Sequence, residues 1–206
     1  AEESSKGGGS PSGTKNLVLY PRYVIFQNAY FWMPIFFLYF VERVSLPELL
    51  TLEVIYYVAV VALEVPSGYC SDRFGRRLTL MGSALALASA YAVFCFANDM
   101  LALSIAQTLL AAGIALNSGS ETSFHYDSLE ALGKTEEYAD REARISRLSL
   151  LSRSGAVLLG GLIATIDIRW AYGLSCSAAL IALLTASRFS EPPQSEAAQS
   201  PLRQFI

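Results

Sequence analysis

Six long, charge-poor apolar runs divide this chain, and they constrain its fold more than any other feature. They cover residues 23–41, 49–69, 78–97, 100–120, 145–166 and 170–187. Each run is 18 to 22 residues long, and a helix needs about 17–25 residues to cross a bilayer. Strands of a membrane barrel would be about 9–11 residues long with alternating polarity. The runs therefore predict an all-α integral membrane protein built as a six-transmembrane-helix bundle.

The composition supports a membrane protein and excludes several other classes. Only 16% of the residues are charged, against roughly 25% in soluble domains. A net charge of −3 gives no reason to expect a nucleic acid as partner. Cys70, Cys95 and Cys176 are too few and too far apart for a disulfide framework or a cysteine metal site. We expect no metal and no cofactor, and the lipid bilayer as the surroundings.

Lys and Arg concentrate on one side of the predicted membrane. Counting the N-terminus as the first connecting segment, the odd-numbered segments hold eleven of these residues, and the even-numbered ones hold only Arg43 and Arg169. The positive-inside rule then predicts a multi-pass protein of the plasma membrane with both termini in the cytoplasm. Residues 1–22 are expected to be a disordered cytoplasmic leader, residues 23–187 the six-span bundle, and residues 188–206 the start of a cytoplasmic linker in a truncated chain.

The most informative stretch, residues 64–77, joins the second run to the third. Gly75 permits a positive φ in a tight turn, and Asp72 and Arg76 are four residues apart, so they can pair if the loop is helical. On chemistry alone, the stretch can also be interpreted as a basic cytoplasmic turn with a capping aspartate. Its fixed positions read G-x-x-x-D-R-x-G-R-R and are filled by Gly68, Asp72, Arg73, Gly75, Arg76 and Arg77.

This pattern between a second and a third span resembles the signature loop of the major facilitator superfamily. The resemblance covers about residues 20–190. It implies a fold of twelve spans in two halves, with the substrate held between the halves. The chain then corresponds to the N-terminal half, and its partner would be the missing C-terminal six-span half or a second copy. The implied function is secondary active transport of a small solute by alternating access, with ion or proton coupling.

The resemblance also implies a latch that holds the cytoplasmic side closed. Asp72, Arg76 and an acid at the inner end of the fourth span would form it, and either Asp127 or Glu121 would supply that acid. Simple pairing of charges at the membrane interface is the alternative. These residues are candidates for a conformational role, and we expect no catalytic residues.

Ionisable residues inside a membrane are costly and point to function. Glu64, Glu121 and Asp127 are expected at a similar depth to Arg153, so we predict a network of acids around this arginine. Glu53 lies nearer the outer surface, where its side chain can reach the interface.

A second candidate site lies along the first run. Amides inside a bundle need partners, so Gln27 and Asn28 are expected to face the interior. With nearby aromatic side chains they would line a substrate cavity, although packing is the commoner role of such rings. The predicted lining residues are Gln27, Asn28, Tyr30, Trp32 and Tyr57.

Other functions compete with transport. No phosphate-binding loop of the G-x-x-x-x-G-K-[ST] type is present, which excludes ATP coupling through such a loop in this chain. Ser120 and His125 could suggest a hydrolase, but both lie on one helix or its extension, and no second-helix base is available. We therefore predict no enzyme activity. A non-transporting six-helix scaffold, or a half-size protein that dimerises, remains the alternative.

Overall fold

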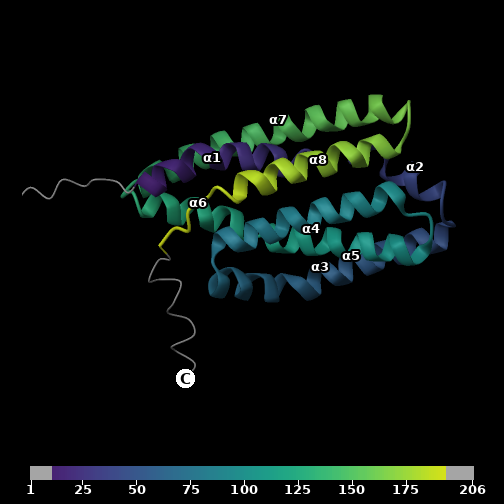
Figure 1. Ribbon diagram of the computed structural model, residues 1–206, viewed down its shortest axis with the longest axis horizontal. Coiled ribbons are helices and arrows are strands. Elements are labelled where there is room, and N and C mark those ends of the chain that lie inside the picture. The colour runs from purple at the N-terminus through teal and green to yellow at the C-terminus, as the bar shows by residue number, and fades with distance from the viewer. Residues whose placement is uncertain (1–10, 194–206) are drawn as a thin grey trace, which may run out of the picture.

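The computed structural model describes residues 11–193, and helices are the only regular elements in that part of the chain. They run roughly parallel in an elongated bundle (Figure 1). This confirms the all-α prediction. In chain order the elements are α1 (Pro11–Gln27), a 3₁₀ turn (Met33–Ile35), α2 (Phe36–Val41), α3 (Leu46–Phe74), α4 (Arg76–Phe96), α5 (Met100–Asn117), α6 (Ser120–Glu130), a 3₁₀ turn (Thr135–Glu137), α7 (Tyr138–Ala164) and α8 (Arg169–Ala186).

Five helical segments of the described chain are long and apolar enough to cross a membrane. They are Leu46–Phe74, Arg76–Phe96, Met100–Glu130, Thr135–Ala164 and Arg169–Ala186. The first apolar run differs from the prediction, because it does not form one continuous helix. It contains the end of α1, an irregular stretch and the short helix α2.

The interruption of the first run has a physical cause in its sequence. The Val24 carbonyl accepts both from the Asn28 amide at 3.1 Å and from Asn28 Nδ2 at 3.0 Å, so the Asn28 side chain bonds to the last turn of α1, where the helix ends. Six residues later, Pro34 has no backbone N–H to donate. Irregular backbone at membrane depth is tolerated only where protein surrounds it or where it lines a cavity. The interruption therefore marks a place where the chain packs against protein or lines a cavity.

The N-terminal segment is more ordered than the sequence suggested. Helix α1 begins at Pro11, within the stretch that we expected to be a disordered leader. Asn16 is buried, its Nδ2 donates to the Ser190 carbonyl at 2.8 Å, and its Oδ1 accepts from the Ser190 amide at 2.9 Å. The start of α1 is thereby attached to the segment after α8. Residues 1–10 and 194–206, which include most of the expected linker, lie outside the described part of the chain.

The long connection predicted over residues 121–144 is largely helical. Helix α6 follows α5 after a turn at Gly119, whose φ of 73° suits glycine. Helix α7 already begins at Tyr138, ahead of the apolar run. These helices extend one end of the bundle, where α6 lies beside α1 (Figure 1).

Helix α4 lies at the centre of the bundle and packs on α5 and α8. Helices α3 and α7 lie at its opposite edges (Figure 1), and only 11% of the apolar segment of each is buried. Val58, Val61 and Val65 of α3 are more than half exposed. Side chains of this kind suit contact with lipid or with another helix.

Gly160 generates the first testable prediction. A Cβ at this position would overlap the backbone of Phe31 in the interrupted first run, whereas a Cβ on Gly161 would meet nothing within 4 Å. Gly160→Ala should therefore destabilise the fold by about 1–3 kcal/mol, as overpacking does. Thermal unfolding of the detergent-purified protein measures this. Gly161→Ala is the matched control, and equal melting temperatures for the two variants would contradict the close approach.

Candidate functional site

The turn between α3 and α4 consists of Gly75 alone. Its φ is 97°, in the region that favours glycine. A Cβ on Gly75 would also lie 2.7 Å from Cδ of Glu191. The backbone conformation therefore favours glycine here, and the absence of a side chain leaves room for the carboxylate of Glu191.

Arg76, the next residue, joins three helices. Its Nη1 donates to Asp72 Oδ1 and to Ser71 Oγ, both at 2.8 Å and both on α3. Its Nε donates to Asp127 Oδ2 on α6 at 3.3 Å. Arg76 and Asp127 are 8% and 5% exposed, so little water competes for this pair. Of the two acids predicted as the third member of the latch, Asp127 makes the contact.

Glu191 completes this group from the segment after α8. Its Oε1 accepts from the Arg76 amide at 2.6 Å, and its Oε2 accepts from the Arg77 amide at 3.0 Å. A carboxylate at this place satisfies the free N–H groups at the start of α4 and complements the helix dipole. Burial raises the pKa of the Glu191 carboxyl, while its hydrogen bonds to the two amides oppose that shift.

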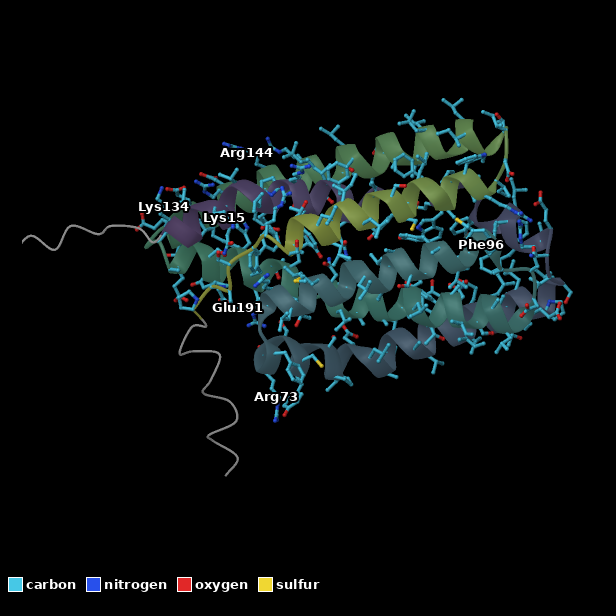
Figure 2. The ribbon with its side chains drawn as sticks, in the orientation of Figure 1. Lys15, Arg73, Phe96, Lys134, Arg144 and Glu191 are labelled. Atoms are coloured by element: carbon cyan, nitrogen blue, oxygen red, sulfur yellow. The ribbon has the colours of Figure 1, made fainter. Side chains whose placement is uncertain are left out.

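We call Ser71, Asp72, Arg76, Asp127 and Glu191 the Arg76 cluster. Figure 2 shows Glu191 at the end of the bundle that also carries Arg73, Lys15, Lys134 and Arg144, with Phe96 at the opposite end. No pattern in the sequence indicates Glu191, because a single acid beyond the last apolar run has no distinctive spacing.

The side chains of Arg73 and Arg77, two other residues of the signature pattern, make bonds outside this cluster. Arg73 bonds to the hydroxyl of Tyr69 and lies over its ring. Arg77 donates from Nη2 to the Ser187 carbonyl at 2.8 Å, which links α4 to the end of α8. A Cβ on Gly68 would meet nothing within 4 Å, so no contact with another described residue requires glycine there.

The three acids of the predicted network around Arg153 lie in three different places in the structure. Asp127 belongs to the Arg76 cluster, and Glu64 lies exposed on α3. Glu121 remains beside Arg153, because both line a cavity of about 270 Å³, which we call the Arg153 cavity. Within it, Arg153 Nη2 donates to Asn28 Oδ1 at 2.7 Å.

His125 is buried and bonds through Nδ1 to Glu142 at 2.7 Å, while its ring stacks on Tyr20. No hydrogen bond joins it to Ser120 in the described chain. The serine–histidine pair of a hydrolase is therefore not assembled in this conformation. Residues 11–193 also contain no group of three side chains suited to hold a metal ion.

A second cavity, of about 300 Å³, lies between the interrupted first run, α3 and α5. We call it the aromatic cavity. It contains two of the predicted cavity residues and several that the sequence did not indicate. The lining side chains are Trp32, Met33, Phe36, Glu53, Tyr56, Tyr57, Gln107 and Leu110.

The remaining predicted cavity residues have other positions. Gln27 is buried, and its Nε2 donates to Ser83 Oγ at 2.8 Å. Asn28 lines the Arg153 cavity instead. The ring of Tyr30 lies 5.1 Å from the guanidinium carbon of Arg153. Both amides face the protein interior as expected, but they do not join the aromatic rings in one site.

Glu53 lies in the aromatic cavity and is directed inward. Its Oε1 accepts from Gln107 Nε2 on α5 at 2.9 Å. The sequence suggested that this side chain would reach the membrane interface. The inward hydrogen bond reflects the buried amide on the neighbouring helix, which the sequence of α3 alone does not reveal.

The pair of Arg76 and Asp127 generates the second prediction. Asp127→Ala removes one member of a buried charged pair and should destabilise the protein by about 2–3 kcal/mol. Thermal unfolding in detergent measures the change. Asp140→Ala, at an exposed position of α7, should change stability by no more than about 0.5 kcal/mol. Equal stability of the two variants would show that the contact has no energetic importance.

Comparison with known proteins agrees with the features described above. The family model described as Major Facilitator Superfamily matches residues 22–205, which is most of the chain. No curated protein matches it. The matched range includes the five candidate spans, both cavities and the Arg76 cluster. The chain therefore belongs to the major facilitator superfamily.

Proposed function

We propose that this protein is a secondary active transporter that moves a small solute by alternating access, with the Arg76 cluster closing its cytoplasmic side. Membership of the major facilitator superfamily supports a transporter. The observation that carries the mechanism is the position of Arg76, whose bonds join α3, α4 and α6. Its backbone amide also binds Glu191, which brings in the segment after α8.

The cluster has the properties of a switch that can open. Asp127 is buried with Arg76, whereas the side chain of Asp72 is 56% exposed. An exposed partner can exchange its bond for water at low cost, because surface ion pairs contribute only about 0–1 kcal/mol. Separating α3 from α6 would then break a small set of bonds between otherwise intact helices, as rigid-body transitions do.

The arrangement of the helices supports a second six-span unit as partner. Helices α3 and α7 bury little of their apolar segments and lie at opposite edges. Both cavities include residues of one of these helices. We propose that a second six-span unit, in the same protein or in a second copy, packs against the exposed apolar faces of α3 and α7 and encloses the solute.

Acids at membrane depth provide candidates for ion or proton coupling. Glu53 lies in the aromatic cavity, and Glu121 lies beside Arg153. Such a carboxylate could bind a proton in one step of transport and another partner in the next, because an unpaired charge in a membrane is unfavourable. This exchange would couple the movement of the proton to the movement of the solute.

The basic residues support an orientation in the plasma membrane with both termini in the cytoplasm. Lys15, Lys134 and Arg144 gather at the end of the bundle where α1 begins (Figure 2). The opposite end carries Arg43 and Arg169 as its only basic residues in the described chain. The positive-inside rule assigns the basic end to the cytoplasm.

Cysteine labelling tests this orientation. In a background where Cys70, Cys95 and Cys176 are replaced by serine, Lys134→Cys and Asn98→Cys place single thiols at exposed positions of opposite ends. An impermeant maleimide added to intact cells should label Asn98→Cys and should reach Lys134→Cys only after permeabilisation. The reverse pattern would invert the proposed orientation.

The variant Asp72→Asn tests the closure. Losing the charge of Asp72 should weaken its bond to Arg76 by up to about 1 kcal/mol, which shifts an open–closed equilibrium by up to about fivefold. We expect faster labelling of a cysteine at Ser149, in the Arg153 cavity, from the cytoplasmic side. We also expect slower flux of radiolabelled solutes into proteoliposomes. Asp140→Asn is the control, and wild-type behaviour of Asp72→Asn in both assays would reject the latch.

A further inference from the structure

The aromatic cavity combines rings from two helices and from the irregular stretch that precedes the first of them. Trp32 comes from the interrupted first run, Phe36 from α2, and Tyr56 and Tyr57 from α3. A cavity of about 300 Å³ lies at the lower end of the range for small-molecule sites. Its size therefore suits a small solute.

The rings of this cavity are held in place by neighbours. Trp32 Nε1 donates to the Tyr91 hydroxyl at 3.1 Å, and its ring centroid lies 5.7 Å from that of Phe36. Tyr56 and Tyr57 lie edge to face, with centroids 5.0 Å apart. Because these contacts exist without a solute, binding would require little ordering of the rings.

A carboxylate lies among these rings without a basic partner. The hydrogen bond from Gln107 is the only one to the Glu53 side chain within residues 11–193, and no Lys or Arg of that range pairs with it. Gln107 is 1% exposed, and its Oε1 has no hydrogen-bond partner. Its amide can point only one way, because a carboxylate accepts hydrogen bonds and Nε2 is the donor. Among the residues that the structure describes, the cavity therefore contains an acidic side chain and lacks a basic one.

From these observations we propose that the aromatic cavity binds an organic cation, meaning a single positive charge on a small apolar or aromatic body. Ring faces of Trp and Tyr attract cations, as in aromatic cages that recognise quaternary ammonium groups. Glu53 supplies the opposite charge. An anion would be repelled by this carboxylate, and a neutral solute would leave it unpaired. The inference names the solute class of the transporter and rests on the proposed function.

The Arg153 cavity provides a contrast within the same molecule. It contains a cationic side chain, and polar surface predominates over apolar surface along its walls. Only the aromatic cavity combines ring faces with an acid that lacks a basic partner, among the cavities described.

Calorimetric titration of the full-length protein in detergent with phenyltrimethylammonium tests the proposal. Glu53→Gln keeps the shape of the side chain and removes its charge, and it should weaken binding about tenfold. Glu64→Gln makes the same change at an exposed position of the same helix, outside the cavity, and should leave binding unchanged. N,N-dimethylaniline, which is neutral at pH 7.5, and benzenesulfonate, an anion, should bind at least about tenfold more weakly. Binding that is equal in Glu53→Gln and wild type, or equal for the neutral probe, would overturn the proposal.

A second pair of variants guards against a folding defect in Glu53→Gln. Tyr57 is 62% exposed, so its replacement should not disturb the core. Tyr57→Leu should weaken binding of the cation about threefold or more, within the range of a cation–π contact, while Tyr57→Phe keeps the ring and should bind as the wild type does. Equal binding by both variants would contradict a role for the ring.

The solute class and the transport function fail in different ways. Flux of a solute panel that includes neutral and anionic compounds measures transport independently of cation binding. Flux of another solute without binding of phenyltrimethylammonium would overturn the cation proposal and leave the transporter intact. Binding that depends on Glu53, without flux of any solute, would support the site and count against the transporter.

Discussion

The interior of a bilayer offers no water, so each polar group that the chain places there needs a partner from the protein. The described helices meet part of this demand by short chains of hydrogen bonds between neighbours, whereas some of their buried atoms, such as Gln27 Oε1 and Gln107 Oε1, have no hydrogen-bond partner within residues 11–193. Gln27 donates to Ser83, and Ser83 Oγ in turn donates to the Gly113 carbonyl at 2.7 Å. Asn28, at the interruption of the first run, accepts from Arg153. These bonds connect α1 to α4, α5 and α7, and they decide which faces of the helices meet.

The same constraint explains why two places have functional potential. In the Arg76 cluster, acids of α3 and α6 both bond to the guanidinium of Arg76, and the carboxylate beyond α8 binds the first amides of α4. In the aromatic cavity, Glu53 has only an amide as partner. The Arg76 cluster pairs its arginine with acids of the same protein and therefore suits a conformational switch. The aromatic cavity contains an acid without a basic partner and therefore suits the binding of a solute. Both roles follow from how completely the local charges are paired.

Much of this architecture could be predicted from the sequence. The length of the apolar runs predicts helices that cross a membrane, and the spacing of Asp72 and Arg76 predicts their pairing. Other features depend on contacts between distant residues. Neither Asn16, in a stretch of leader-like composition, nor Glu191, beyond the last run, has a local pattern that reveals its partner. Glu53 and Gln107 likewise belong to different helices, and only the packing of α3 on α5 brings them together.

We propose that Arg76 acts through Asp127 to hold α4 and α6 together during transport. A double-mutant cycle on solute flux in proteoliposomes tests it most directly, with Arg76→Gln, Asp127→Asn and the double variant. Residues that act as one unit give non-additive effects. If Arg76 and Asp127 act as one unit, the double variant should transport no more slowly than the slower single variant. Fully additive losses in flux would show that the two side chains act independently and would contradict it.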